Sequence, residues 1–465
     1  MQEKLDEQNV HIEKYQPFPF YKLENGNDDN SRVYGQLYIE EDTIWDEGES
    51  RRIRVSASLV NRKMLNMEYE AREEGECPLF FYEFTGEMEL KRWQSEGRLD
   101  CQDCNYTNME GYYAFKIHEI REEGEAARIL QEHRSNRCFV GDLIFSASPI
   151  LSAKAVLVVE ETDDSLDKDA IKKLIATYNS WDKAIKSNSR CIYDKTKILE
   201  ILSIYWDDEY CEKVSIYNVG QANCCYCKMT KSSFFFDIGV TKSGEDREDV
   251  SIKKAIDEIG LLDSDGVVLS HWDLDHILGV CYNSKCLHSK LWIVPDFEKL
   301  YKRPRVSIKR LCNYLLRNGN STILMIDTTD INKEFYKSNI NKIFLYLGEP
   351  KSANGINKMN NGGLILRLEN TKNILLPGDC ENSIIPSKAV AVPYNYVMIP
   401  HHGSVMSDPT VIAKPYTSAA YYSCGNVTGN CNIDVAIVDK YKEKGFSEVH
   451  CTRKLKKNYK FFVNL

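Results

Sequence analysis

Hydrophobic and polar residues alternate in short stretches over the first third of the chain. Alternation over a few residues, or a short continuous apolar run, is typical of β-strands. Three stretches have this character: residues 33–39, 53–57 and 155–159. We therefore predict a β-rich region across residues 30–160.

The spacing of apolar residues then lengthens to a helical period. Over residues 165–187 they recur every three or four positions, which indicates a helix beginning at a Ser165 or Asp167 cap. Residues 197–205 extend the helical pattern, and from Val214 onward apolar runs alternate with turns and helical stretches. The patterns predict three parts: a β-rich N-terminal domain of residues 1–160, a helical connector of residues 161–211 and a mixed α/β domain of residues 212–465.

One apolar run of the third part ends in a turn rich in possible metal ligands. Residues 266–269 lead into a His-x-Asp-x-Asp-His cluster made of His271, Asp273, Asp275 and His276. Imidazole nitrogens together with carboxylate oxygens suit zinc, manganese or iron. A solvated acidic loop is the alternative, but two of only nine histidines fall here. We predict that this cluster binds metal.

Two further apolar runs end on residues of the same kind. One stops at Asp379 and the other at His401 and His402. Either turn alone is a weak signal, because Gly-Asp is a common turn dipeptide and a histidine pair can lie at the surface. Three strand ends that each deliver His or Asp, however, indicate a site for two metal ions with a bridging carboxylate. Asp379, alone on its strand end, fits the bridge.

Length and composition limit the class of protein. At 465 residues the chain is too long for one ordinary domain, and no stretch approaches the roughly 20 apolar residues that cross a bilayer. The N-terminus is polar and acidic, without the apolar core of a signal peptide. We expect a cytoplasmic protein with no membrane partner.

The sixteen cysteines are expected to be reduced thiols in such a compartment. Cys225 and Cys227 alternate on one face of a predicted strand, where we expect them in the core. An alternative for the N-terminal region is a structural zinc site. Its ligands would be Cys77, Cys101, Cys104 and Cys138.

Charge is unevenly distributed along the chain. Residues 1–50 hold thirteen acidic and four basic residues, an imbalance equal to the net charge of −9. Residues 285–317 carry nine basic residues, and residues 451–465 carry five with no acid. A local basic surface can attract phosphates even on an acidic protein. Solvated helix and strand faces explain the same residues equally well.

The motifs of the third part follow one another in a family-specific order. They are residues 218–223, 235–239, 271–276, 361–366, 377–379 and 401–404. In order and spacing they resemble the metallo-β-lactamase superfamily, and within it the hydrolase domain of the ComEC-like competence proteins. That branch has the His-x-Asp-x-Asp-His form, where most relatives have His-x-His-x-Asp-His. The resemblance covers residues 212 to about 410, under half of the chain.

The resemblance implies a four-layer αβ/βα sandwich with metal at the edge where two sheets meet. It implies the following ligands: His271 and Asp273 on one metal, Asp275 and His276 on the other, Asp379 as the bridge, and His401 or His402 completing one shell. Asp275, His276 and Asp379 would be the catalytic residues, with metal-activated hydroxide as the nucleophile.

Two departures from the family pattern affect this expectation. Both acids of the opening motif are asparagines here, Asn218 and Asn223, and the family's middle histidine has no matched counterpart. His288 is the only histidine in that interval, and its closeness to the first cluster predicts a surface residue. We therefore expect one or two divalent ions, zinc or manganese.

The functional expectation is a metal-dependent hydrolase. The leading hypothesis is a phosphodiesterase or nuclease acting on DNA or another nucleic acid, with the N-terminal domain recruiting a protein partner, by analogy in bacterial defence. One alternative is a small-molecule phosphoesterase of the phosphocholine or cyclic-nucleotide type. The other is a non-enzymatic interaction protein with a vestigial metal site.

Overall fold

The computed structural model of the chain describes two compact units. One unit contains residues 1–187 with 303–318, and the other contains residues 188–302 with 319–465. The described residues are 32–47, 50–61, 65–70, 83–91, 101–105, 113–119, 137–145, 154–155, 158–161, 165–241, 249–300, 306–330, 333–350, 358–404, 407–416, 418–424, 435–454 and 459–465. No helix among them is long and apolar enough to cross a membrane.

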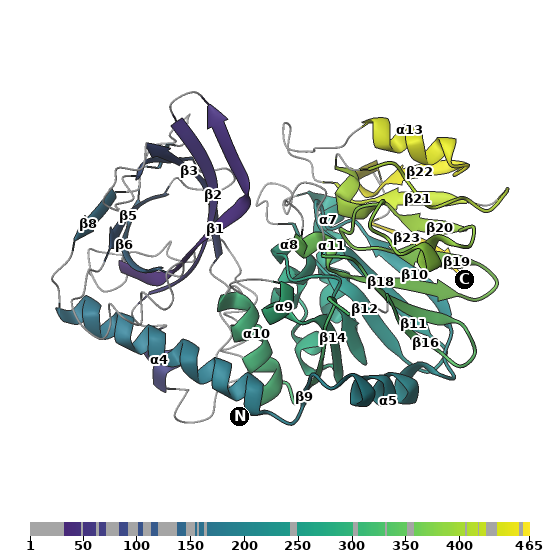
Figure 1. Cartoon of the computed structure of the whole chain (residues 1–465), viewed down its shortest axis with the longest axis horizontal. Helices are drawn as coiled ribbons and strands as arrows, with labels where there is room; N and C mark the ends of the chain where they lie inside the picture. The colour runs from purple at the N-terminus through teal and green to yellow at the C-terminus, as the bar shows by residue number, and fades with distance from the viewer. Residues whose placement is uncertain are drawn as a thin grey trace. The chain divides into compact units, whose positions relative to one another are not determined.

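The first unit contains an eight-stranded sheet (Figure 1). Its strand order is β7-β4-β3-β2-β1-β6-β5-β8, antiparallel throughout except for the parallel pair β5 and β8. The strands are β1 (Arg32–Glu47), β2 (Ser50–Asn61), β3 (Glu83–Lys91), β4 (Cys101–Asn105), β5 (Tyr113–Glu119), β6 (Arg137–Phe145), β7 (Lys154–Ala155) and β8 (Val158–Glu161). The stretches predicted at residues 33–39 and 53–57 lie in β1 and β2, which pair with each other.

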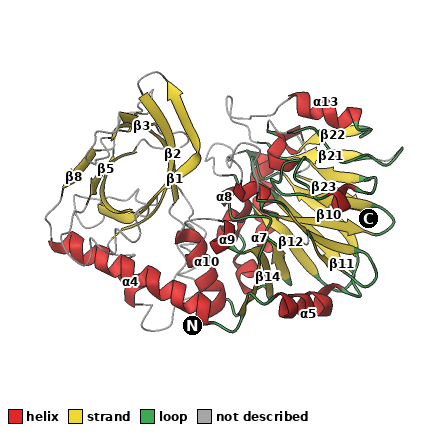
Figure 2. Cartoon of the chain, in the orientation of Figure 1, coloured by secondary structure: helices red, strands yellow, loops and turns green. Residues whose placement is uncertain are grey.

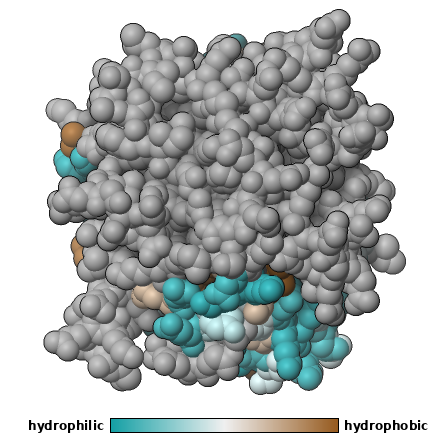
Figure 3. Space-filling model, turned by 90° about the vertical axis from the view of Figure 1, so that its left-hand side faces the viewer, coloured by the Kyte–Doolittle hydropathy of each residue, from teal (hydrophilic) through white to brown (hydrophobic). Residues whose placement is uncertain are grey.

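Two long helices belong to the same unit. Helix α4 (Ser165–Ser187) has the bounds that the helical period predicted, with Leu174, Tyr178 and Trp181 on its buried face. Its exposed face is hydrophilic and is visible along the lower edge of Figure 3. Helix α10 (Val306–Arg317) packs against α4.

Ion pairs join α10 to the rest of the first unit. Arg310 of α10 and Glu68 form a fully buried pair at 2.7 Å, and Lys309 reaches Asp182 of α4, also at 2.7 Å. In sequence, however, α10 lies between two strands of the second unit. The chain therefore passes between the units three times, near residues 187, 302 and 318.

The second unit contains two sheets with accompanying helices (Figure 2). Their strand orders are β23-β10-β11-β12-β13-β14-β15-β9 and β16-β17-β18-β19-β20-β21-β22. The first comprises β9 (Cys191–Ile192), β10 (Cys211–Tyr217), β11 (Cys224–Met229), β12 (Ser233–Ile238), β13 (Gly266–Val268), β14 (Leu291–Pro295), β15 (Thr322–Ile326) and β23 (Lys460–Asn464). The second comprises β16 (Glu334–Lys337), β17 (Ile343–Leu347), β18 (Leu364–Glu369), β19 (Asn373–Leu376), β20 (Tyr396–Met398), β21 (Ala419–Tyr422) and β22 (Glu448–Cys451).

Shorter elements connect these strands. The helices are α5 (Lys195–Trp206), α7 (Val250–Leu261), α8 (Leu274–Ile277), α9 (Phe297–Leu300), α11 (Lys358–Asn361), α12 (Ser387–Val390) and α13 (Val435–Glu443). The 3-10 turns are η3 (Leu278–Cys281), η4 (Ser284–His288), η5 (Pro400–Gly403) and η6 (Thr452–Lys454). Helix α5 covers the predicted helical residues 197–205.

One hydrophobic core draws side chains from both sheets. Phe236 and Ile293 from the eight-stranded sheet belong to the same core as Leu345 from the seven-stranded sheet. Tyr346, the next residue, lies on the opposite face because successive strand residues alternate, and it belongs to a second core with Tyr441 of α13. The predicted mixed α/β architecture with two sheets is confirmed, and it is consistent with a metallo-β-lactamase-like fold.

Parallel strands bring distant residues to one edge of each sheet. Strands β12, β13, β14 and β15 run parallel, as do β19, β20, β21 and β22. Asp237 and His271 lie at the carboxyl ends of β12 and β13, while Asp379 and His402 follow β19 and β20. All three strand ends predicted to carry ligands are therefore real strand ends.

The cysteines differ in part from expectation. Cys424 and Cys451, at the ends of β21 and β22, form a disulfide, so the prediction of reduced thiols is wrong for this pair. The other cysteines with described side chains are buried free thiols. Cys225 and Cys227 lie in the shared core, as predicted. The side chains of the alternative zinc site at Cys77, Cys101, Cys104 and Cys138 lie outside the described part of the chain.

Candidate metal centre

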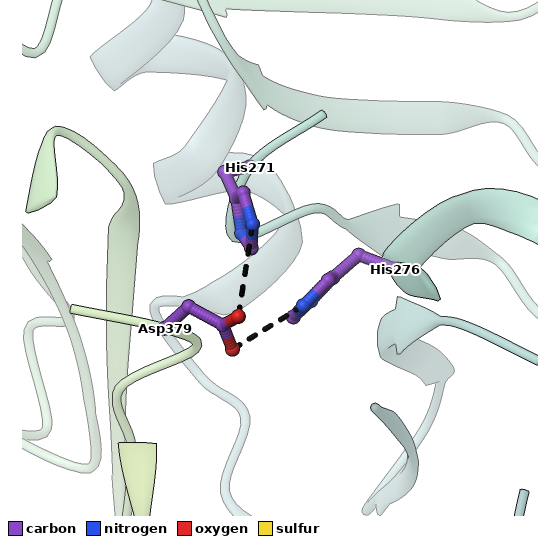
Figure 4. Close-up of side chains that lie close together, drawn as sticks. All are labelled: His271, His276 and Asp379. Atoms are coloured by element: carbon purple, nitrogen blue, oxygen red, sulfur yellow. Dashed lines mark ion pairs between the residues drawn. The ribbon is translucent and has the colours of Figure 1, made fainter. Parts of the chain in front are cut away.

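Three turns bring six of the seven predicted ligands together. His271 follows β13, and Asp273 is the first residue before α8, which carries Asp275 and His276. Asp379 follows β19, and His402 lies in η5 after β20. Figure 4 shows His271 and His276 pointing at the carboxylate of Asp379.

The ligand atoms form two overlapping groups. His271, His276 and Asp379 make one, and Asp275, His276 and His402 make the other, with all ligand atoms of each group within 4.8 Å of one another. His276 Nε2 lies 3.3 Å from Asp379 Oδ1, and His271 Nε2 lies 4.0 Å from Asp379 Oδ2. His402 Nε2 lies 3.3 Å from Asp275 Oδ2 and 3.7 Å from Asp379 Oδ2. His276 and Asp379 are thus close to both groups.

Two of these four distances, both 3.3 Å, match those expected between ligands of one ion, and the other two, 3.7 Å and 4.0 Å, are longer. Two atoms each bound to a tetrahedral metal at 2.0–2.2 Å lie about 3.3–3.6 Å from each other. His271, His276 and His402 are almost completely buried, yet none of their Nε2 atoms makes a hydrogen bond within the protein. Buried polar atoms are normally hydrogen-bonded, and a metal ion bound at these nitrogens would satisfy them together with the carboxylates that face them. The residues present therefore fit a divalent metal.

The carboxylate of Asp273 lies close to the first group. Its Oδ2 lies 3.5 Å from His271 Nε2, and its side chain keeps 25% of its exposure, against 4% for Asp379. Asp275 is intermediate at 16%. Asp273 and Asp275, the two aspartates of the first motif, are therefore the most solvent-exposed members of the cluster.

The histidine pair divides into one residue inside the cluster and one outside it. His402 belongs to the second group, whereas His401 is more exposed and belongs to neither group. His401, His402 and Gly403 all have positive φ values, of 48°, 56° and 78°. A left-handed backbone in two successive non-glycine residues is strained and tends to persist at functional sites. This turn, which sequence could not show, directs His402 inward.

Asp237 is a residue of the site that the ligand prediction omitted. Its backbone is left-handed at φ 54°, and its Oδ2 accepts a hydrogen bond from His276 Nδ1 at 2.8 Å. It also accepts from the Ser270 backbone N at 2.6 Å and from Ser270 Oγ at 2.8 Å. A carboxylate can only accept, so His276 carries its proton on Nδ1 and presents Nε2 to the cluster.

Ser270 fixes the proton position of the His271 imidazole in the same way. Its single hydroxyl proton goes to Asp237, so its oxygen accepts from His271 Nδ1 at 3.1 Å. His271 and His276 are thus both fixed with Nε2 facing Asp379. The Asp-x-Gly motif at residues 237–239 was the sequence signal that could have revealed Asp237.

Asn223 gives the altered opening motif a function in the site. Its side-chain amide donates to Asp379 Oδ1 at 3.2 Å, and its backbone N donates to the carbonyl of Asp275 at 3.1 Å. Asn218, the other asparagine in place of an acid, bonds Ser251 at the start of α7. His288 is exposed, as predicted.

Gly239 permits the close packing beneath α8. A Cβ built on Gly239 would lie 1.8 Å from the carbonyl oxygen of Asp275 and 2.6 Å from that of Asn223. Gly239→Ala is expected to displace Asp275, lowering metal affinity about tenfold or more and the free energy of unfolding by about 1–3 kcal/mol. Metal titration and thermal unfolding measure the two effects. Gly260→Ala on α7 is the control. Its Cβ would lie 2.9 Å from the Tyr282 carbonyl oxygen, so it should lower the free energy of unfolding without changing metal affinity. Unchanged metal affinity in Gly239→Ala would contradict this packing.

Proton and metal compete for His276. Burial alone would lower the pKa of His276, but the charges of Asp379 and Asp237 outweigh it and hold that pKa well above its ordinary value. Burial likewise opposes ionisation of Asp379, yet His276 and His402 hold its pKa well below the usual range. In the metal-free protein a protonated His276 therefore faces an ionised Asp379.

Metal affinity is consequently expected to rise with pH. A metal must displace the His276 proton, and each proton released changes affinity by up to about tenfold per pH unit below the raised pKa. Calorimetric titration with zinc or manganese at about pH 6, 7 and 8 measures this, together with proton uptake by buffers of different ionisation enthalpy. An affinity independent of pH over that range would disprove the competition.

Known proteins resemble this chain only distantly. No family model and no curated protein matches it. Among solved structures, a proposed metal-dependent hydrolase from Parabacteroides distasonis has 12% identity, covers 52% of this chain and 96% of its own, and has a TM-score of 0.29. A diphosphatase of the PhnP family has 10% identity, 50% and 72% coverage, and a TM-score of 0.26. A protein of unknown function from Enterococcus faecalis has 15% identity, 40% and 49% coverage, and a TM-score of 0.24. At such TM-scores these similarities decide neither the fold nor the activity of this chain.

Proposed function

We propose that this chain is a metal-dependent hydrolase that cleaves phosphodiester bonds. The observation that carries the proposal is the convergence of three buried imidazole Nε2 atoms, none of them hydrogen-bonded within the protein, on the carboxylates of Asp275 and Asp379. When bound, divalent ions at such a site acidify a water molecule and neutralise charge on a phosphoryl oxygen. The chain itself would hold and orient the ligands, all of which except Asp273 and Asp275 are almost completely buried.

The charge of the ligand set favours an anionic substrate. Three carboxylates, Asp273, Asp275 and Asp379, would face two divalent ions, which leaves a net positive charge for a phosphate group. The carboxylate-rich set also suits manganese as well as zinc. Because Asp273 and Asp275 are the partly exposed members, substrate would approach from their side.

Ion pairs involve part of the basic segment predicted to favour nucleic acid. Five of its nine basic residues pair with acids: Lys285 with Asp263, Lys290 with Asp265, Lys299 with Asp327, Lys309 with Asp182 and Arg310 with Glu68. Lys302, Arg303 and Arg305 lie outside the described residues. DNA or another nucleic acid stays the first proposed substrate class on the phosphodiester chemistry alone, without support from this segment. The ion pairing favours a second candidate, a small-molecule phosphoester.

A metal-supplemented activity panel separates these functions. Zinc- or manganese-loaded protein is assayed against single-stranded DNA, duplex DNA, RNA, cyclic dinucleotides and bis-p-nitrophenyl phosphate. A nucleic-acid substrate predicts that affinity falls steeply with added salt, whereas a small phosphoester predicts a weak salt dependence. If no bound metal is recovered after addition of zinc or manganese, both enzymatic proposals are wrong.

A further inference from the structure

Ser423 connects two of the candidate ligands through a buried hydrogen-bond chain. It is the first residue after β21, and its Oγ lies 2.7 Å from His402 Nδ1 and 3.1 Å from Asn223 Oδ1. Asn223 continues the chain by donating from Nδ2 to Asp379 Oδ1 at 3.2 Å. All four side chains are at least nine-tenths buried. These hydrogen bonds therefore connect His402, in the turn after β20, to Asp379, in the turn after β19.

The donor and acceptor of each hydrogen bond in this series follow from the Asp379 carboxylate at one end. An ionised carboxylate can only accept, so the Asn223 amide nitrogen must face Asp379, and its oxygen must face Ser423. Ser423 then gives its single proton to Asn223. Its oxygen can only accept from His402, which places the imidazole proton on Nδ1 and leaves Nε2 as the metal-facing nitrogen.

A strand pairing and a disulfide hold the backbone on the two sides of Ser423. Tyr422, the preceding residue, pairs with Cys451 of β22, and Cys424, the following residue, is bonded to the same Cys451. The serine thus lies between a sheet contact and a disulfide that share one partner residue. Losing the disulfide would free the backbone on the C-terminal side of Ser423 while leaving the strand pairing in place.

We propose that Ser423 is a positioning residue that fixes His402 and Asp379 relative to each other for metal binding, and that the Cys424–Cys451 disulfide anchors it. The inference rests on the metal site of the proposed function. It makes metal retention sensitive to a reductant, although no cysteine is a ligand. Reduction by a phosphine consumes the disulfide, the phosphine and water, and gives two thiols and a phosphine oxide.

The test compares zinc affinity, measured by competition with a chromophoric chelator, in the full chain and two serine variants. Ser423→Ala is expected to weaken zinc binding about tenfold to a hundredfold, the usual cost of losing a partner that orients a ligand. Ser418→Ala is the matched control, because Ser418 is a buried serine at the other end of β21 whose hydroxyl bonds the Gly445 carbonyl. It should bind zinc as the wild type does. Circular dichroism of the metal-free proteins confirms that each variant is folded.

The disulfide is tested on the unaltered chain and on a double variant. Treatment with tris(2-carboxyethyl)phosphine should weaken zinc binding by the wild type, and Cys424→Ser with Cys451→Ser should bind zinc equally weakly with or without the phosphine. That insensitivity excludes effects through the other cysteines. This arm tests the disulfide whether or not Ser423→Ala folds. If Ser423→Ala does not fold, Ser423→Gly takes its place as the variant without the hydroxyl.

The possible results separate this inference from the function on which it rests. A wild-type chain that binds no zinc overturns the metal site itself. A wild-type chain that binds zinc, with Ser423→Ala within twofold of it, overturns the role of Ser423 alone. Zinc binding that the phosphine leaves unchanged in the wild type overturns the role of the disulfide. Weaker binding in Ser423→Ala and in the reduced wild type, with Ser418→Ala unchanged, supports both.

Discussion

Asp379→Ala is expected to abolish hydrolysis and to lower metal affinity by more than about a hundredfold. Asp379 is 3% exposed, and its two oxygens face all three clustered histidines, at 3.3 Å from His276, 4.0 Å from His271 and 3.7 Å from His402. Losing a partner that only orients a ligand already costs about tenfold to a hundredfold, so losing a carboxylate close to both groups should cost more. Metal content after dialysis and turnover of the panel substrates measure both effects.

Two variants make this result specific. Asp379→Asn keeps the shape and one oxygen but removes the charge, and it should also be inactive because neutral amides bridge metals poorly. Asp296→Asn is the matched control: Asp296 is 5% exposed and follows the parallel strand β14, outside both metal groups. It should retain metal and activity. Wild-type turnover by Asp379→Ala would disprove the site.

His276→Ala is expected to remove metal from both groups and reduce hydrolysis to background. His276 is the only residue that belongs to both groups, and it is fully buried. The variant also leaves Asp237 without its imidazole partner, although Ser270 still donates to it twice. The free energy of unfolding should therefore fall by about 1–3 kcal/mol, the usual cost of a buried polar group that loses a partner.

The number of metal ions bound per chain distinguishes the loss of both ions in this variant from the loss of one ion. Elemental analysis should find neither ion in His276→Ala, whereas His271→Ala or His402→Ala removes a ligand from one group alone. His450→Ala serves as control, because His450 pairs with Glu448 on β22 away from the cluster. Should His276→Ala retain its full metal content and turnover, its shared position would have no functional meaning.

Local sequence patterns predicted the elements that carry the site, but not the contacts among them. The strand ends before His271, Asp379 and His402 could be located because apolar runs and turns are local signals. The choice between His401 and His402 could not be made, because it depends on a left-handed turn that non-glycine residues rarely adopt. Ser423 was likewise missed, since its partner Asn223 is 200 residues away in sequence.

The charge and helix patterns of the sequence did not show which residues pair with the basic segment or pack against α10. The basic segment of residues 285–317 reads as a phosphate-binding surface only if its charges are free, and the structure pairs Lys309 and Arg310 with acids more than a hundred residues distant. The amphipathic period of α10 predicts one buried face, whereas the structure buries ten of its twelve residues, and the period does not show which helix packs against it. Such information lies in the tertiary fold.

Helix α10 also has a consequence for how this protein is synthesised and inherited. The first unit lacks α10, and with it the Arg310 partner of Glu68, until residues 303–318 have left the ribosome, by which time much of the second unit has been translated. A gene fragment that starts at residue 188 would carry α10 without α4, and it would expose apolar side chains and the Arg310 guanidinium, which the intact chain buries. Recombination at a single junction can therefore not exchange one unit for another. The chain therefore has no single cut point that yields both units complete.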